Sequence, residues 1–179
     1  MLTTISKMEF YDVVKTRRSI RRYKKDPVPN ESLKRILDSA RMAPSGSNRQ
    51  KWKYYVVKDQ EMIQKLASAC GEQSWIAQAP VVIVATGWRV GYNRGGYMGE
   101  MSFIMDVAIS FTHLILAARA ENLGTCWIGD FDNSEVKKIL GIKDDEEVVA
   151  VTPLGYPDGI GFIEVTNRKK LDDIVEEIR

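Results

Sequence analysis

The sequence predicts an α+β protein that forms a single domain over residues 1–179. Segments with a helical spacing of apolar residues alternate with short apolar runs typical of strands. Hydrophobic residues make up 44% of the 179 positions and charged residues 28%, which suffices for the core of one globular domain. The continuous apolar run Val81–Ala85 predicts a central strand that is covered on both faces.

The first half of the chain is predicted to contain three helices and one strand. Met8–Thr16 has apolar residues at helical spacing and runs into a basic stretch. Two prolines then interrupt the backbone before Asn30, which is predicted to cap a second helix that stops at Pro44. The strand-like segment 53–58 follows, and Asp59 is predicted to cap the third helix.

The second half is predicted to contain one long helix, three shorter helical segments and three strands, counting the apolar run. The long helix, 100–122, is apolar on most sides and should be central to the fold or to a subunit interface. Asp132 and Glu135 form a predicted capping box for a helix that ends at Gly141. The other predicted elements are a short helix at 75–79, strands at 125–128 and 147–154, and a C-terminal helix with one apolar face, Leu171, Ile174, Val175 and Ile178.

Positive charge is concentrated in one short segment of the chain. Arg17–Lys25 contains six cationic side chains, whereas the net charge of the whole chain is only +2. Such a segment can be a solvated basic face, a patch for nucleic acid or membrane, or a pocket for one small phosphate. Acidic runs at 144–147 and 176–177 offset the basic residues, which weighs against a general binder of polyanions.

The cysteines and the apolar stretches favour a cytoplasmic protein. Cys70 and Cys126 lie far apart with no Cys/His spacing around them, so neither a metal site nor a disulfide framework is indicated. Residues 1–7 contain no apolar segment typical of a signal peptide, so we expect no secretion. The most apolar stretch, 103–118, is too short for a membrane span and contains an acid and a histidine, so we expect a core helix and no membrane anchor.

Two loops and two polar side chains are further candidates for function. Segment 44–52 combines turn formers with hydrogen-bonding side chains, and it either wraps a polar ligand or simply connects a helix to a strand. Segment 87–99 sets aromatics and arginines among glycines, and it either covers a planar anionic substrate or is a surface loop. His113 is interpreted as a hydrogen-bonded structural residue, whereas Asp106 must find a polar partner within an apolar helix.

Several common catalytic motifs do not occur in this sequence. There is no G-x-G-x-x-G after a strand, no G-x-x-x-x-G-K-[ST] and no G-x-S-x-G, and the single histidine makes a Ser-His-Asp or Cys-His arrangement hard to build. The sequence therefore has places to hold an anion and a flat molecule but little acid/base chemistry of its own. This combination is typical of a protein whose bound cofactor supplies the reactivity.

Five segments, taken together and in this order, resemble the FMN-dependent nitroreductase family. The resemblance runs from about residue 9 to residue 173, nearly the whole chain. It implies a three-layer fold with a central, mostly antiparallel sheet of four to five strands between helices, and an intertwined homodimer. The five segments are Arg17-Arg18-Ser19-Ile20-Arg21, Ala43–Trp52, Leu123–Gly129, Leu154-Gly155-Tyr156-Pro157 and Arg168-Lys169-Lys170.

The resemblance implies that two distant basic segments share one FMN molecule. Arg17 and Ser19 would bind phosphate oxygens, with Arg18 near the same site, through charge-assisted hydrogen bonds. Arg21 would reach the pyrimidine end of the isoalloxazine ring, where a positive charge stabilises the reduced flavin. Arg168 and Lys170 match the basic pair that closes on the phosphate.

The resemblance also implies that a second copy of the chain completes each site. The loop formed by Pro44, Ser45, Gly46, Ser47 and Asn48 would come from the other subunit of a homodimer, with Ser45 and Asn48 as polar contacts. The backbone of Trp127, Ile128 and Gly129 would run beside the flavin, with the N–H of Gly129 or of Asp130 close to the flavin N5 atom. No catalytic side chain and no metal are implied.

The implied reaction is a ping-pong transfer of hydride from NAD(P)H to FMN and then to a nitroaromatic, a quinone or a similar oxidised small-molecule acceptor. The absence of a Rossmann fingerprint agrees with a nicotinamide cofactor that binds only in passing. Specialised flavin chemistry, such as dehalogenation, dehydrogenation or flavin fragmentation, is an alternative within the family. A non-catalytic nucleic-acid-binding module that uses Arg17–Lys25 is a second alternative, and the balanced charge of the remaining chain weighs against it.

Overall fold

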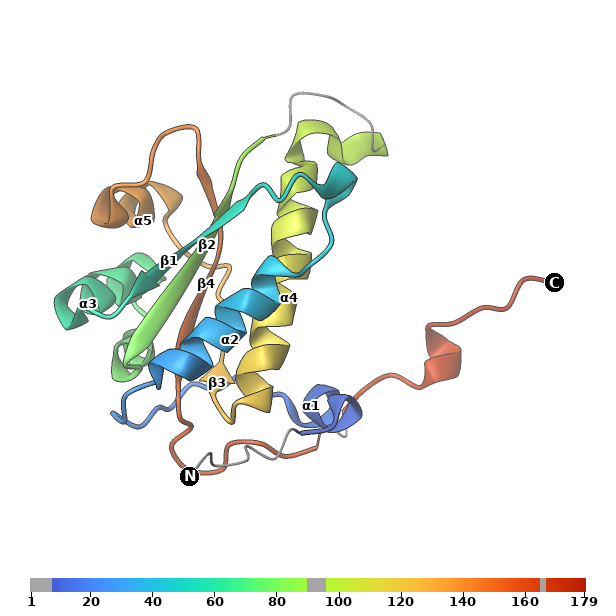
Figure 1. The fold of residues 1–179 in the computed structure, drawn as a ribbon, viewed down its shortest axis with the longest axis horizontal. Helices are drawn as coiled ribbons and strands as arrows, with labels where there is room; N and C mark the ends of the chain where they lie inside the picture. Colours follow the sequence, from blue (N-terminus) through green and yellow to red (C-terminus); the bar gives the residue numbers. More distant parts are fainter. Residues whose placement is uncertain (1–7, 90–95, 165–166) are drawn as a thin grey trace.

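An antiparallel sheet of four strands forms the centre of the molecule (Figure 1). The structure is a computed structural model and describes residues 8–89, 96–164 and 167–179. The strands lie in the order β1-β2-β4-β3, and all three neighbouring pairs are antiparallel. Their bounds are Trp52–Val57 (β1), Val81–Gly87 (β2), Gly124–Thr125 (β3) and Glu147–Gly155 (β4).

Helices cover both faces of this sheet. In Figure 1, α2 and α4 lie on one side of the strands, and α3 and α5 lie on the other. The α-helices are α1 (Phe10–Thr16), α2 (Asn30–Arg41), α3 (Gln60–Ala69), α4 (Phe103–Ala120) and α5 (Asn133–Leu140), and a short 3-10 helix, η2 (Ser74–Gln78), joins the α3 side. This arrangement confirms the predicted three-layer α+β fold with a mostly antiparallel sheet.

The central strand β2 shows why the sequence forms three layers. All seven of its residues are buried. Because successive side chains of a strand point to opposite faces, Val81, Ile83 and Ala85 pack with α2 and α4. Val82 and Val84 pack with α3, α5 and η2. A run with no polar position is therefore what a strand between two helical layers requires.

Helix α4 is the longest element and packs across the sheet. Phe111 and Leu114 are fully buried, whereas Met105 and Ile109 are exposed. By length and composition alone, residues 99–120 could cross a membrane. Its buried side chains instead belong to the core that β2 and β4 share with α2, as expected for a core helix. The exposed apolar side chains show that one face of α4 lacks cover in a single chain.

The predicted helix caps are partly correct. Asp59 accepts a hydrogen bond from the Met62 backbone N–H, and Asp132 accepts one from Glu135. Asn30, however, is the first residue of α2 and not its cap, since its side chain accepts a hydrogen bond from Lys58 instead. The second helix also ends at Arg41, three residues before the proline expected to stop it.

The predictions of a strand at 125–128 and of a C-terminal helix are wrong. The strand expected at 125–128 is only two residues long as β3, because the chain leaves the sheet after Thr125 and touches it again at Ile128 through a single bridge to Val151. The expected C-terminal helix is replaced by one 3-10 turn, Leu171–Asp173. An isolated helix of this length is marginal without a surface to pack on.

Two predictions concern segments that lie wholly or partly outside the described residues. The absence of a signal peptide was inferred from residues 1–7, which lie outside them. In the glycine-rich segment 87–99, residues 90–95 also lie outside. The described Arg89 at its start forms an ion pair with Glu100 at 2.9 Å.

Candidate cofactor site

The basic segment lies along the edge of the sheet beside β3. The Ile20 backbone N–H donates to the Thr125 carbonyl at 2.9 Å, and the Lys24 N–H donates to the Tyr156 carbonyl at 2.9 Å. A Cβ atom on Gly124 would lie 2.7 Å from Cγ1 of Ile20, so this close approach requires glycine. The resembling segments around Arg17, Thr125 and Tyr156 are therefore neighbours in space.

Apolar side chains of the basic segment anchor it, while its arginines are at least partly exposed. Ile20 and Tyr23 are buried and form a small cluster with Ala79. The Tyr23 hydroxyl donates to the Ile20 carbonyl at 2.6 Å, and burial raises the pKa of Tyr23. Arg17 and Arg18 are half-buried, and Arg21 is exposed. The anchored backbone thus fixes the positions from which the arginines reach out.

The arginines share a cavity with the segment that approaches the C-terminus. This cavity has a volume of about 420 Å³. It brings Arg168 to the four residues of the basic segment that the sequence singled out as FMN ligands. The lining residues are Arg17, Arg18, Ser19, Arg21, Ile163, Glu164, Asn167 and Arg168.

Four arginines and one acid, Glu164, line the cavity, so cations outnumber acids there. Burial lowers the pKa of Arg17, and the neighbouring charges of Arg168 and Arg18 lower it further. Within the described ranges, no ion pair forms to Arg17, Arg18 or Arg168. Like charges held this close favour an anion between them, and guanidinium groups suit phosphate oxygens. The residues present therefore fit the phosphate of FMN.

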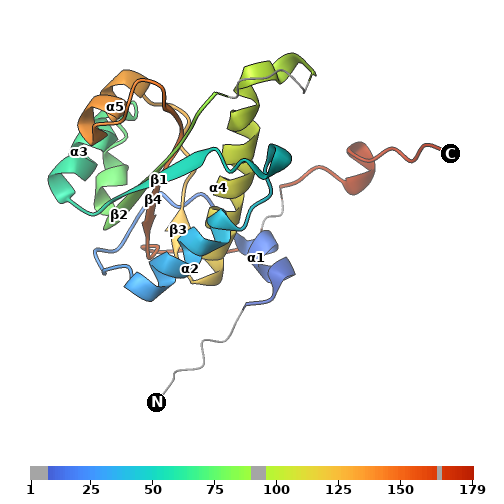
Figure 2. The same cartoon turned by 45° about the horizontal axis from the view of Figure 1, so that its top comes forward.

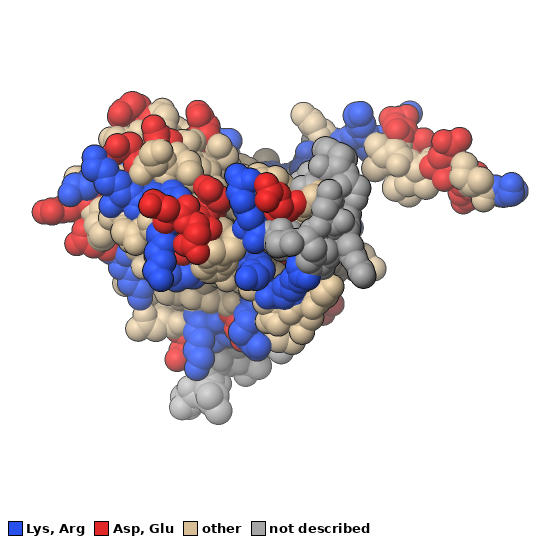
Figure 3. All heavy atoms as spheres, turned by 90° about the horizontal axis from the view of Figure 1, so that it is seen from above, with Lys and Arg blue, Asp and Glu red and all other residues tan. Residues whose placement is uncertain are grey.

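The other cations of this region lie apart from the cavity. Lys170 is exposed and does not line it. Arg22 forms an exposed ion pair with Asp158 at 3.3 Å, and Lys24 and Lys25 are exposed. Elsewhere the surface mixes both signs, since Figure 3 shows Lys and Arg interspersed with Asp and Glu on the face it displays. A continuous basic face is not seen there.

The segment after β3 offers two exposed backbone donors, those of Gly129 and Asp130. Trp127 is 40% exposed and rests edge-on against Phe111 at 4.7 Å between ring centroids, while Ile128 is buried. Gly129 is exposed, and a Cβ atom there would meet nothing closer than 3.9 Å. Within the part of the chain that the structure describes, the N–H groups of Gly129 and Asp130 donate no hydrogen bond. They are free to bind a ligand.

The loop with Pro44, Ser45, Gly46 and Asn48 lies at the opposite end of α4. The Gly46 N–H donates to Asp106 Oδ1 at 3.0 Å, which gives this acid the partner that the sequence demanded. Ser47, Asn48 and Gln50 have positive φ angles of 52–53°, although none is glycine. Ser45 Oγ accepts from the Gln50 N–H at 2.9 Å and braces the turn. A strained and braced loop of this kind is typical of a binding site.

One chain does not bring this loop to the basic segment. Asp106 is in the first turn of α4, whereas Thr125, which pairs with Ser19, follows the last turn. At 1.5 Å per residue, the two ends of α4 are separated by roughly 20 Å or more. Figure 1 shows the loop beside the upper end of α4 and α1 beside the lower end.

The structure shows the surroundings of three polar side chains of this region, and one of them, Arg119, was overlooked in the sequence. Burial raises the pKa of Cys126, although Arg21, Ser19 and Arg17 act in the opposite direction. Arg119 is buried in the last turn of α4. A charged residue in an apolar helix was the signal that singled out Asp106, and it would have found Arg119 too. The third, His113, lies 3.3 Å from the Ser39 carbonyl through Nδ1, in keeping with a structural role.

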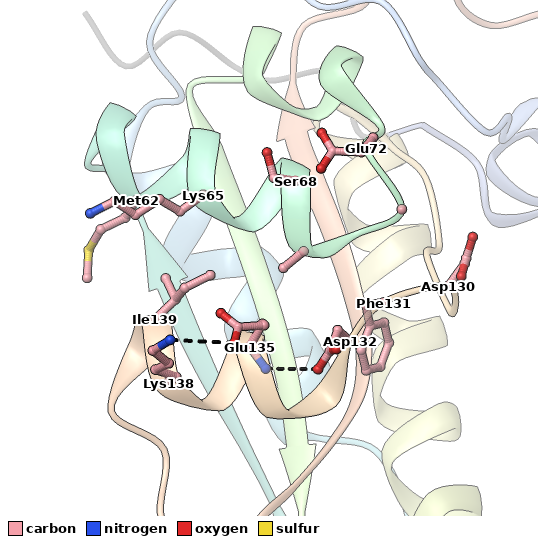
Figure 4. Close-up of a pocket in the computed structure, with 12 residues that line it drawn as sticks. Met62, Lys65, Ser68, Glu72, Asp130, Phe131, Asp132, Glu135, Lys138 and Ile139 are labelled. Atoms are coloured by element: carbon pink, nitrogen blue, oxygen red, sulfur yellow. Dashed lines mark hydrogen bonds and ion pairs between the residues drawn. The ribbon is translucent and has the colours of Figure 1, made fainter.

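A hollow larger than this cavity lies elsewhere, between α3 and α5 (Figure 4). Its volume is about 960 Å³, and it contains none of the predicted ligands except the neighbouring Asp130. Its charged groups are engaged along α5, because Lys138 pairs with Glu135 at 3.5 Å and Asp132 caps the helix (Figure 4). Size alone therefore does not mark the site.

Comparisons with known proteins agree with the geometry. The model of the Nitroreductase family matches residues 14–78 and 67–156. A relative from Archaeoglobus fulgidus, provisionally named NADH dehydrogenase/NAD(P)H nitroreductase, is 32% identical over 94% of this chain and 98% of its own. Iodotyrosine deiodinase 1 of Rattus norvegicus is 26% identical over 93% of this chain and 68% of its own.

A solved structure shows the same fold. The nitroreductase family protein of Clostridium novyi NT superimposes with a TM-score of 0.80 at 33% identity, over 84% of this chain and 86% of its own. The family match spans both the basic segment and the segment after β3. This chain therefore belongs to the nitroreductase family.

Proposed function

We propose that this chain is an NAD(P)H-dependent FMN oxidoreductase that reduces nitroaromatic, quinone or similar oxidised acceptors. The observation that carries the proposal is the cavity where Arg17, Arg18 and Arg168 gather without an ion pair in the described ranges. FMN brings a phosphate to neutralise them and a reactive ring that this chain cannot supply with side chains. Family membership and the name of the archaeal relative support the same cofactor chemistry.

Different residues would bind different parts of FMN. Arg17, Arg18, Ser19 and Arg168 would bind the phosphate, and Lys170 would join them only if its exposed side chain turns inward. Arg21 would place a positive charge near the pyrimidine end of the ring. The Gly129 or Asp130 N–H would orient the ring edge, because neither group has another acceptor in the described structure.

When bound, FMN supplies two-electron transfer between NAD(P)H and the acceptor. The protein's share is to bind and orient the cofactor and to leave one face of the ring open to both small molecules in turn. No side chain is assigned the role of acid or base. The exposed Trp127 and Gly129 are consistent with a shallow, accessible site.

A homodimer would complete the site. The strained loop at Ser45 and Asn48 lies a helix length away from Ser19 within one chain, so both can contact one FMN only if the loop comes from a second copy. The uncovered apolar surface supports this arrangement. Phe10 and Tyr11 of α1 are 63% and 75% exposed, and Phe10 and Ile109 of α4 both line a cavity of about 610 Å³.

The C-terminal residues supply further apolar surface for a second copy. Figures 1 and 2 show residues 167–179 reaching away from the body of the molecule. The side chains of Leu171, Ile174, Val175 and Ile178 in this segment are all exposed. Apolar side chains on an extended arm are typical of an exchanged contact between subunits. We infer an intertwined homodimer whose protomers each form one FMN-binding domain over residues 1–179.

The chemistry and composition favour a cytoplasmic location without nucleic acid or membrane partners. Cys70 and Cys126 are both free and buried, as suits a reducing compartment. The cations of Arg17–Lys25 divide between a small cavity and solvent, and they do not form a continuous track for a polyanion.

Dehalogenation is the second candidate, because a deiodinase is similar over nearly the whole chain. One experiment tests both. The protein is purified, its absorbance is recorded, and FMN released by denaturation is identified. Chemically reduced, FMN-loaded protein is then offered nitroaromatics, quinones and 3-iodotyrosine in turn. A yellow protein reoxidised by nitro compounds or quinones supports the proposal, and reaction with iodotyrosine alone supports dehalogenation. A colourless protein that takes up no added FMN refutes both.

A further inference from the structure

Arg119, in the last turn of α4, is a buried cation to which the proposed function gives no role. Arg119 is only 7% exposed. It forms no ion pair with any residue in the described ranges, and burial lowers the pKa of its guanidinium group. A charge is expensive to bury without an opposite charge, so a buried arginine of this kind points to a specific role.

The guanidinium group touches three segments that are distant in the sequence. Its Nε donates to Thr16 Oγ1 at 2.9 Å, and one terminal nitrogen donates to Asn122 Oδ1 at 3.2 Å. Its central carbon lies 3.9 Å from the ring centroid of Phe162, which is a close cation–π contact. One side chain thus joins the end of α1, the end of α4 and the chain that follows β4.

Two of these contacts lead directly to the two sides of the anion cavity. Thr16 is the last residue of α1 and precedes Arg17, whose backbone N–H closes the helix on the Val13 carbonyl at 3.0 Å. Phe162 precedes Ile163 and Glu164, which line the cavity together with Arg168. Arg119 does not line the cavity itself. It contacts Thr16 and Phe162, each of which directly precedes a residue that lines the cavity.

We propose that Arg119 is a positioning residue that fixes the spacing between Arg17 and the Arg168 segment and so presets the cavity for a phosphate dianion. The inference rests on the proposed function in taking FMN as the ligand. Arg17, Arg18 and Arg168 line one cavity, so their like charges repel one another before an anion binds. A clamp between the walls keeps this repulsion from opening the site.

The chemistry of the clamp requires arginine in particular. A planar guanidinium can stack on Phe162 while its edge donates hydrogen bonds to Thr16 and Asn122. Lysine would keep the charge but lose the planar fork. If Arg119 acts by positioning, lysine should therefore not replace it. If only its positive charge matters, lysine should replace it.

The test compares the full-length wild type with Arg119→Met, Arg119→Lys and Phe162→Leu. Arg35→Met is the matched control, because Arg35 pairs with Glu121 at 2.7 Å and does not line the cavity. Fluorescence titration gives the Kd for FMN and for riboflavin, which lacks the phosphate. Melting temperatures report folding, and inorganic phosphate is titrated as a separate probe of the cavity by its stabilisation of the apoprotein.

Arg119→Met should raise the Kd for FMN by about tenfold and leave the Kd for riboflavin within about twofold. Arg119→Lys should resemble Arg119→Met, Phe162→Leu should weaken FMN about threefold, and Arg35→Met should change neither Kd. The inference is overturned if FMN and riboflavin weaken together, if neither weakens, or if lysine restores full affinity. Should Arg119→Met fail to fold, the FMN-to-riboflavin ratio of Phe162→Leu decides in the same way.

Failure of the proposed function gives a different pattern. If the wild type binds phosphate but not FMN, the proposed cofactor is wrong, and the phosphate titrations of the variants then decide the role of Arg119. If the wild type binds neither ligand, the proposed function and the positioning role both fall.

Discussion

Arg17 is the single side chain on which the anion site depends most directly. It is half-buried, it lines the cavity with Arg168, and both burial and its cationic neighbours lower its pKa. Arg17→Gln should therefore raise the Kd for FMN about tenfold or more, because a charge-assisted contact to phosphate is lost. Arg22 does not line the cavity and pairs with the exposed Asp158, so Arg22→Gln should leave the Kd for FMN nearly unchanged. Equal effects of the two changes would contradict the assignment of roles within the basic segment.

The two cysteines should be slow to react in the folded protein. Burial, with a smaller effect of Asp130, raises the pKa of Cys70 to about 12. Burial also raises the pKa of Cys126, although Arg21, Ser19 and Arg17 oppose the shift. At pH 8, Ellman's reagent should label both thiols far more slowly in native than in denatured protein, and Cys126 before Cys70. Rapid native labelling of Cys70, identified by mass spectrometry, would contradict this.

The raised pKa values of the two cysteines determine how their contribution to stability changes with pH. A thiol in the unfolded chain loses its proton near pH 8.5. The folded thiols keep theirs to higher pH, because burial raises their pKa values. Their contribution to stability is thus fully present below about pH 8.5 and is lost as the pH rises toward the folded-state values.

At the scale of elements, the loop at 44–48 depends on α4. Asp106 accepts the Gly46 N–H at 3.0 Å, and the loop carries strained positive φ angles at Ser47 and Asn48. Asp106→Ala should lower the unfolding free energy by only about 1 kcal/mol, since this hydrogen bond is exposed. It should weaken FMN binding more than Asp38→Ala, which removes only an exposed ion pair with Arg41. An unchanged Kd would show that the loop conformation does not matter to binding.

Gly124 tests the close contact between β3 and the basic segment. A Cβ atom at this position would lie 2.7 Å from Ile20 Cγ1 and 2.9 Å from Ile20 Cβ. Gly124→Ala should therefore lower the unfolding free energy by about 1–3 kcal/mol, as overpacking does. Gly129→Ala, where no atom comes closer than 3.9 Å, serves as the control for stability. Equal melting temperatures for the two variants would mean that the segments are not packed as described.

Sequence patterns predicted well those elements that are determined by residues within or next to the element itself. The run Val81–Ala85 has no polar residue because both of its faces are covered, and Asp59 caps α3 through its own side chain. The C-terminal helix was predicted wrongly because its apolar spacing does not show what it packs against. The apolar side chains of the C-terminal segment are exposed among the residues that the structure describes, so they do not stabilise a helix there.

The same distinction holds for the candidate site. The family resemblance assigned Arg17, Ser19 and Arg168 to one site, and one cavity joins them across about 150 positions of the chain, while their role in binding FMN stays a prediction. The charge of Arg119 within an apolar helix could have marked it as a candidate, but only its contacts with Thr16 and Phe162 reveal its place beside the cavity. Long-range packing of this kind has no signature in sequence spacing.

At the scale of the whole molecule, we propose that the parts of the site come from two copies of the chain. The cations gather at the C-terminal end of α4, and the strained loop lies beside its N-terminal end. Exposed apolar side chains on α1, on α4 and on the C-terminal arm give a second copy a large surface to cover. A composite FMN site is therefore the central claim.

Complementation in a mixed dimer tests this claim most directly. One chain carries Arg17→Gln, the other carries Ser45→Ala with Asn48→Ala, and different affinity tags allow the mixed dimer to be isolated. Neither parental dimer should bind FMN tightly. If the loop acts across the interface, the mixed dimer has one intact site and should bind about one FMN per two chains with wild-type affinity. If both parts act within one chain, every site stays damaged, and the absence of tight FMN binding would contradict the account.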